Sequence, residues 1–316
     1  MTPLCITPQY EGRPHSYVKL WNHHAAQWEA DEIGQRFGIR ISSELMLPKI
    51  LQLINEDYEI YRSVDQILEA GDWLGQLLTG KKACSASMAS YKAMWTPKSG
   101  YAFETRLGEL HPLLNGMVKA KLSGKIYFPG EKIGRLTAEW AERLGLKEGM
   151  AIGSSMIDAH AGIPGCGITR PGQMMLVIGT STVQAVLENV SYQEKGIYGS
   201  VKDTVIPEYY TWESGIAAAG DVFQWFTSQC VPESYIRQAE REGEGIHKLL
   251  EKQAQTLKPG ESGVMALEWW NGNKTPYIDS NRSGILVGCT LQTRPEETYP
   301  STWRGNVRGS SSRRGN

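Results

Sequence analysis

Two short stretches of the sequence combine residue types that can do chemistry. In GSSMIDAHAG (153–162), an aspartate follows an apolar stretch and stands among small side chains. Asp158 and His160 lie two residues apart, so on a strand they share a face and could form an acid/base pair or bind a metal ion. His23 and His24, upstream, could add ligands. The alternative is that Asp158 caps a turn and each histidine is a structural polar group, since no H-E-x-x-H spacing supports a metal site.

The second stretch is IGTST (178–182), between two apolar segments. A Gly-Thr-Ser-Thr turn presents backbone N–H groups and hydroxyls with little steric bulk, a combination that can cradle phosphate oxygens. An ordinary hairpin turn is the alternative. Two charged residues are further candidates. Lys92 lies among aromatic and small residues in ASYKAMW, and could equally be a surface lysine. Glu213 stands at an expected helix start, where a carboxylate suits the helix dipole and simple capping is the alternative.

Hydrophobic periodicity predicts the elements that must position these residues. The predicted helices are 42–57, 63–80, 137–146, 213–226 and 245–257. The predicted strands are the two halves of 173–188, around a turn, and 264–270. Ser63 and Gln66 predict a capping box, and Gly80 a C-cap. Helices followed by strands without strict βαβ alternation indicate a mixed α/β protein of two domains.

Composition narrows the class of partner. The chain has 316 residues, 41% of them hydrophobic, and a formal net charge of −1. This balance gives no basic surface for nucleic acid and no polybasic patch for a membrane, so a small molecule or a protein is the expected partner. Five scattered cysteines predict neither a disulfide framework nor a zinc site and favour a reduced, cytoplasmic compartment. No apolar run approaches the roughly 18 residues that span a bilayer.

Several long motifs together resemble the FGGY family of carbohydrate kinases, in particular its members that phosphorylate ribulose. The resemblance runs in order from about residue 2 to about residue 299. Its motifs are PHSYVKLWNHHAAQ (14–27), SSELMLPKILQL (42–53), EAGDWLGQLLTG (69–80), ASYKAMW (89–95), GSSMIDAHAG (153–162), PGQMMLVIGTST (171–182), WESGIAAAGDVFQWF (212–226) and WWNGNKTPYID through GCTLQTRPEE (269–297). A match of this order and length is far more specific than any one motif.

The resemblance implies two actin-like, ribonuclease-H-like domains with a cleft between them. It implies transfer of the terminal phosphoryl group of ATP, with Mg²⁺, to O5 of L-ribulose or D-ribulose in L-arabinose catabolism. By the same resemblance, Asp158 is the general base, and Lys92 and Glu213 contact the sugar. The residues that match the family's second phosphate loop are Gly179, Thr180 and Ser181. A homodimer is compatible with this family.

The sequence also departs from the family pattern. It has no motif that matches the first phosphate loop, and it lacks the glycine-rich adenosine segment downstream of TLQTRPEE. We therefore expect both domains to be incomplete, with 1–165 as the sugar-binding part and 166–299 as the nucleotide-binding part. Residues 300–316, rich in Arg, Gly and Ser, are expected to be disordered, and the abrupt end of patterning before them suggests a frameshift or a truncation. Low or no kinase activity is the matching expectation.

Two alternatives to an active kinase stay open at this point. One is a non-catalytic remnant that binds sugar or a partner. The other is a metal-dependent hydrolase that uses Asp158, His160, His23 and His24.

Overall fold

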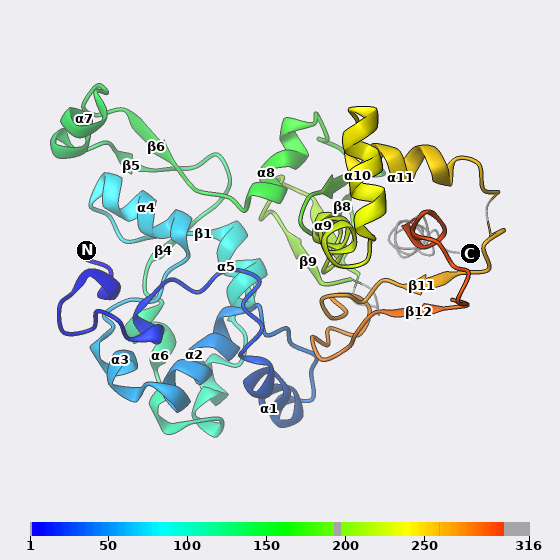
Figure 1. The fold of residues 1–316 in the computed structure, drawn as a ribbon. Coiled ribbons are helices and arrows are strands. Elements are labelled where there is room, and N and C mark those ends of the chain that lie inside the picture. Colours follow the sequence, from blue (N-terminus) through cyan, green and yellow to red (C-terminus); the bar gives the residue numbers. More distant parts are fainter. Residues whose placement is uncertain (1, 193–196, 259, 300–316) are drawn as a thin grey trace. The chain divides into compact units, whose positions relative to one another are not determined.

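The chain divides into two compact units. Figure 1 shows its helices and strands, coloured along the sequence. The computed structural model describes residues 2–192, 197–258 and 260–299, so the predicted tail 300–316 lies outside the described residues. Unit 1 comprises 1–175, 185–193 and 199–212. Unit 2 comprises 176–184, 194–198 and 213–316. The predicted domain boundary after residue 165 stays a prediction.

Unit 1 is built mainly from helices. Its α-helices are α1 (Gln27–Phe37), α2 (Met46–Glu56), α3 (Tyr58–Ser63), α4 (Ala70–Thr79), α5 (Ala86–Ala93), α6 (Met117–Lys121), α7 (Ala138–Leu144) and α8 (Asp158–Gly165). Its short 3-10 helices are Leu4–Ile6, Pro14–Ser16, Glu104–Glu109 and Pro112–Leu114. The predicted helices 42–57 and 137–146 are confirmed as α2 and α7. Pro48 lies in the first turn of α2, where the N–H that proline lacks has no intrahelical partner.

The predicted helix over 63–80 is wrong in its first turn. Ser63 is the last residue of α3, residues 64–69 are not helical, and α4 begins only at Ala70, so the capping box with Gln66 does not form. The Gln66 amide instead donates to the backbone oxygen of Ser123 at 3.1 Å. The predicted end is confirmed, since Gly80 adopts φ +69° after α4, a left-handed conformation that suits glycine.

The strands of unit 1 that lie before α8 form three small ladders. They are β1 (Ala83–Ser85) with β4 (Lys125–Tyr127), β2 (Trp95–Thr96) with β3 (Gly100–Tyr101), and β5 (Lys132–Arg135) with β6 (Ala151–Gly153). The β1–β4 pair is parallel, with Cys84 opposite Ile126, and the other two pairs are antiparallel. Strand β1 leads directly into α5, and β6 leads within four residues into α8.

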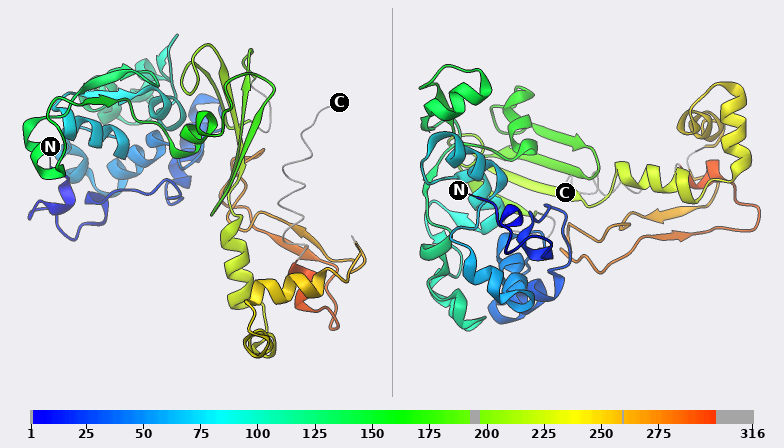
Figure 2. Two further views of the ribbon diagram at one scale, coloured as in Figure 1. Left: turned by 90° about the horizontal axis from the view of Figure 1, so that it is seen from above. Right: turned by 60° about the vertical axis from the view of Figure 1, so that its left-hand side comes forward.

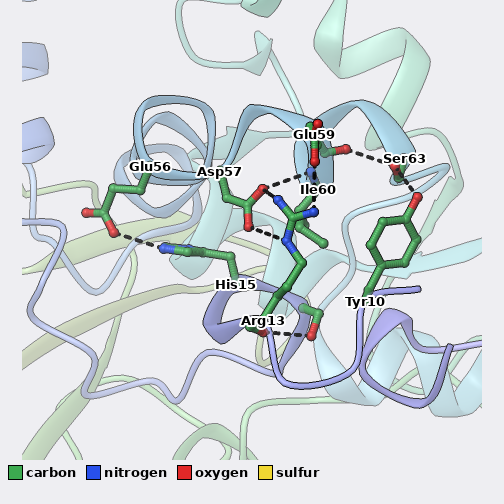
Figure 3. A network of polar contacts seen from close by, with 9 residues as sticks. Tyr10, Arg13, His15, Glu56, Asp57, Glu59, Ile60 and Ser63 are labelled. Carbon is green, nitrogen blue, oxygen red and sulfur yellow. Dashed lines mark hydrogen bonds and ion pairs between the residues drawn. The ribbon is translucent and has the colours of Figure 1, made fainter. Parts of the chain in front are cut away.

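The N-terminal segment is tied to α2 and α3 by a polar network (Figure 3). Arg13 pairs with both Asp57 and Glu59, the latter at 2.9 Å. The imidazole of His15 lies 2.8 Å from the Glu56 carboxylate. Because Asp57 also accepts the backbone N–H of Ile60, the same carboxylate caps α3 and holds the segment.

A four-stranded sheet follows α8 in the chain. Its strands are β7 (Met174–Ile178), β8 (Thr182–Glu188), β9 (Gly199–Lys202) and β10 (Tyr210–Ile216), in the order β7-β8-β10-β9. The predicted strand–turn–strand over 173–188 is confirmed as β7 and β8. The predicted helix over 213–226 is wrong at its start, because Glu213 and Ser214 are buried in β10 and the helix begins only at Gly220.

Unit 2 adds three helices and a two-stranded ladder. They are α9 (Gly220–Gln229), α10 (Glu233–Glu242), α11 (Ile246–Ala254), β11 (Met265–Leu267) and β12 (Ile285–Val287). Figure 2 shows β11 and β12 side by side, and they pair antiparallel with Ala266 opposite Leu286. Phe226, Leu250 and Tyr299 form a buried cluster. The strand predicted over 264–270 is shorter and less buried than expected, since Met265 is 66% exposed. No helix among the described residues is long and apolar enough to cross a membrane.

Candidate functional site

Asp158 is the first residue of α8, and its side chain is exposed. The carboxylate Oδ1 accepts the backbone N–H of Ala159 at 2.7 Å. Within the described residues no ion pair engages this carboxylate. A carboxylate in this setting keeps its basic lone pairs accessible, which is what a proton acceptor for an incoming hydroxyl needs.

His160 does not share a face with Asp158, so that prediction from strand spacing is wrong. The two residues lie on a helix, where positions two apart point to different sides. His160 is completely buried: its Nδ1 lies 3.1 Å from Ser87 Oγ, and its ring packs edge-on against Tyr91 with centroids 4.4 Å apart. Ser87 also accepts the N–H of Ile157 at 3.5 Å. These contacts fix the start of α8 on α5, so we expect His160 to have a structural role.

A second set of contacts fixes the loop before α8. The buried carboxylate Oδ1 of Asp72 accepts the Ser85 N–H at 2.7 Å and the Ser155 hydroxyl at 3.2 Å. The Ser85 hydroxyl in turn donates to the Ser155 carbonyl at 2.6 Å. Burial raises the pKa of Asp72 to about 7, although these two hydrogen bonds favour the charged form. A side chain at Gly71 would lie 2.9 Å from Ser155, so the close approach requires glycine.

Lys92 lies half-buried in the last turn of α5. Lys92 interacts electrostatically with two charged residues, Lys49 and Glu69. Burial, with a smaller contribution from the nearby charge of Lys92, lowers the pKa of Lys49 to about 8. Burial raises the pKa of Glu69, while Lys92 and Lys49 oppose that rise. The Lys49 ammonium also donates to the backbone oxygen of Leu20 at 2.9 Å. Unit 1 thus offers two ammonium donors around one carboxylate, a set that can bind hydroxyl groups.

The predicted phosphate turn lies between β7 and β8 and is exposed at Gly179 and Thr180. Two carbonyls of the turn accept N–H groups from the start of α9: Thr180 from Ala219 at 2.7 Å, and Gly179 from Gly220 at 2.8 Å. The turn is therefore braced by the helix. A Cβ at Gly220 would lie 2.7 Å from the Gly179 carbonyl oxygen, whereas a Cβ at Gly179 would meet nothing within 4 Å. A side chain would therefore clash with the chain at position 220 but not at position 179, and the space beside Gly179 is open to solvent.

Glu213 lies in β10, and its surroundings are unlike those predicted for a helix cap. Its carboxylate Oε1 is 3.5 Å from the Lys274 ammonium, and the two side chains are only 9% and 7% exposed. Its backbone oxygen accepts the Tyr198 N–H at 2.6 Å. A buried carboxylate that is paired with an ammonium remains a hydrogen-bond acceptor.

The two upstream histidines belong to another part of unit 1. His23 lies 3.1 Å from the Gln52 side chain, and burial lowers its pKa. His24 lies 3.5 Å from the Glu44 carboxylate. Among residues 2–192, 197–258 and 260–299, no three His, Cys, Asp or Glu side chains come together to hold a metal ion. The metal-dependent hydrolase therefore gains no support from the described residues.

The sequence did not reveal several residues that hold Asp158, Glu213 and the turn 179–181 in position. Gly220 and Lys274 fell within quoted motifs but received no role, and Ser87 and Asp72 were not singled out as anchors. The small-residue run AAAGD signals a close approach at Gly220. Nothing local in NGNKTP indicates that Lys274 is buried against a residue some sixty positions earlier in the chain.

The fold and these motifs are similar to those of carbohydrate kinases. Residues 174–306 match the profile described as "FGGY family of carbohydrate kinases, C-terminal domain". A ligand-bound xylulose kinase from Lactobacillus acidophilus superposes with a TM-score of 0.74 at 18% identity, over 92% of this chain and 58% of that one. A xylulose kinase from Rhodospirillum rubrum gives a TM-score of 0.68. The predicted fold class is confirmed by these structures.

Among carbohydrate kinases, ribulokinases are similar to this chain over most of its length. A ribulokinase from Shouchella clausii is 43% identical over 308 residues, and one from Staphylococcus aureus is 36% identical over 310 residues. These alignments cover 94% and 95% of this chain but 55% and 56% of the relatives, so the chain spans about half the length of the curated relatives it matches. The chain is related to the FGGY family of carbohydrate kinases, as its motifs predicted.

Proposed function

We propose that this chain carries the sugar-binding and proton-accepting residues of an ATP-dependent ribulose kinase. The observation that carries the proposal is the presentation of Asp158: an exposed carboxylate at the first position of α8, on a helix start held by buried His160 and Ser87. The 43% identity to a ribulokinase supports ribulose as the substrate. Lys92 and Glu213 are proposed to bind its hydroxyl groups.

The proposed reaction needs a base because a primary alcohol is a weak nucleophile at neutral pH. As the O5 oxygen attacks the terminal phosphorus of ATP, the O5–H proton passes to the Asp158 carboxylate. The bond from that phosphorus to the bridging oxygen breaks, and ADP leaves. Proton transfer to a positioned carboxylate contributes about 10²- to 10⁴-fold, and the remaining acceleration comes from positioning and from charge stabilisation.

The turn 179–181 is proposed to contact phosphate oxygens of ATP. The open space beside Gly179 and the bracing of the turn by α9 support this role. Mg²⁺ would accompany ATP and neutralise phosphate charge. The described residues form no acidic cluster that would hold the ion by themselves, so we assign no reaction step to it.

Binding and turnover test the proposal separately. Titration calorimetry of the 316-residue chain with L-ribulose should show binding, with the aldose L-arabinose as the control ligand. In an assay of ADP release with MgATP and L-ribulose, turnover should disappear in Asp158→Asn. Ribulose binding without turnover would support the sugar-binding remnant. A chain that binds neither L-ribulose nor D-ribulose would contradict the proposal.

A further inference from the structure

A buried lysine lies against Glu213, the carboxylate that is proposed to contact the sugar. Lys274 lies in the loop between β11 and β12, and its ammonium is 3.5 Å from Glu213 Oε1. With exposed fractions of 7% and 9%, both side chains are almost entirely removed from solvent. Charged groups are buried in this way only when a partner compensates for their lost hydration.

The lysine is held from a second side by an aromatic ring. The Lys274 ammonium lies 4.9 Å from the centroid of the Tyr198 ring, within the range of a cation–π interaction. The backbone N–H of Tyr198 donates to the Glu213 carbonyl at 2.6 Å. Tyr198 and Lys274 therefore fix Glu213 through its main chain and its side chain.

The loop that carries Lys274 has its own anchors. The Thr275 hydroxyl donates to the Gly215 carbonyl at 2.7 Å and lies 3.2 Å from the Ser214 hydroxyl. Asn273 and Asp279, on either side of Lys274 and Thr275, exchange two backbone hydrogen bonds of 2.9 Å. Because these contacts do not involve the ammonium, the loop can remain in place when the charge is removed.

We propose that Lys274 is a positioning residue for the sugar site, which holds Glu213 ionised and correctly oriented so that its carboxylate accepts a hydrogen bond from a ribulose hydroxyl. The inference rests on the proposed function of Glu213. An adjacent ammonium favours the ionised form of a buried carboxylate. An ionised carboxylate can only accept, whereas a protonated one also donates, so the lysine selects which kind of hydroxyl contact Glu213 can make.

The test is a double-substitution cycle on L-ribulose binding by the full chain. Lys274→Met removes the charge but keeps an unbranched stem, and Glu213→Gln removes the carboxylate charge. Each single substitution should raise the Kd by about tenfold or more, and the double variant should bind no more weakly than either one. Lys274→Arg, which restores a cation, should stay within about threefold of the parent chain. Lys248→Met, which removes an exposed lysine of unit 2, is the matched control.

The outcomes separate the two proposals. If Lys274→Met binds as tightly as the parent chain while Glu213→Gln binds weakly, the positioning role is wrong and the proposed function stands. If the two effects multiply in the double variant, the residues act independently and the positioning role is again wrong. If the parent chain does not bind ribulose, the proposed function fails. Should Lys274→Met not fold, the neutral double variant is compared with Glu213→Gln: equal binding supports the positioning role, and weaker binding of the double variant contradicts it.

Discussion

The start of α8 in unit 1 and the centre of β10 in unit 2 each present a carboxylate, but they hold it in opposite ways. Asp158 is exposed, and the groups that fix its helix are the side chains of Ser87 and His160. Glu213 is buried and lies against the ammonium of Lys274. A group that must take up a proton gains from an accessible carboxylate without a cation, whereas a group that only binds gains from a fixed charge.

The largest expected effect is on turnover at Asp158. Asp158→Asn removes the proton acceptor, so ADP release should fall by about 10²- to 10⁴-fold. Because the side chain is exposed, the free energy of unfolding should change by less than about 0.5 kcal/mol. The matched control is Glu139→Gln, an exposed acid in the first turn of α7. Measurable turnover in the parent chain that is retained at the same rate in Asp158→Asn would contradict the proton-accepting role.

A third carboxylate sharpens the comparison. Asp72 is buried like Glu213, but its contacts are neutral donors, and burial raises its pKa to about 7. The folded state therefore binds the proton more tightly than the unfolded state, whose aspartate pKa is about 3.9. Protonation of Asp72 therefore adds to the free energy of unfolding. This contribution, at most about 4 kcal/mol, is fully present below about pH 4 and is lost as the pH rises through 7.

Urea unfolding between pH 4 and pH 8 measures this dependence. Asp72→Asn keeps an oxygen that accepts both hydrogen bonds but cannot ionise, so its stability should vary less with pH than that of the parent chain. Glu139→Gln serves again as the control and should leave the pH profile unchanged. Parallel profiles for Asp72→Asn and the parent chain would show that Asp72 does not contribute.

His160 should affect stability more than chemistry. His160→Ala removes a fully buried ring that contacts Ser87 and Tyr91, which should cost about 2–4 kcal/mol of unfolding free energy. His24→Ala, at a more exposed histidine, is the control and should cost about 1 kcal/mol or less. Chemical denaturation reports both values. A His160→Ala chain of normal stability that lacks turnover would instead indicate a direct catalytic role.

The smallest effects concern the glycines at the phosphate turn. Gly220→Ala places a Cβ 2.7 Å from the Gly179 carbonyl and should cost about 1–3 kcal/mol. Gly179→Ala meets no atom of the chain, so it should leave the unfolding midpoint unchanged and weaken only ATP binding. Thermal unfolding with and without ATP separates the two effects. ATP binding unchanged by Gly179→Ala would argue against phosphate contact at this turn.

Local sequence signals predicted most elements but fewer of the contacts. Gly80 marks a helix end because it adopts the left-handed conformation, and apolar runs on either side of a turn marked β7 and β8. The end of β10 was predicted as helix because its buried residues include Glu213 and Ser214, whose polar side chains contact Lys274 and Thr275, about sixty positions later in the chain. Tertiary pairing here overrides the local pattern.

In the candidate site, too, the sequence indicated the residues but not the contacts that hold them. Motif resemblance assigned Asp158, Lys92 and Glu213, and those assignments stay predictions until they are measured. The anchors could not be read from spacing, because Ser87 and His160 are separated by 73 positions and Glu213 and Lys274 by a similar stretch of chain.

The most direct test of the contrast between the two carboxylates is the Kd for L-ribulose, measured by calorimetry for the parent chain, Asp158→Asn and Glu213→Gln. If Asp158 serves the chemical step and Glu213 serves binding, Glu213→Gln should weaken binding by about tenfold or more, and Asp158→Asn should change it by less than about threefold. Weaker binding in Asp158→Asn together with normal binding in Glu213→Gln would contradict the assignment.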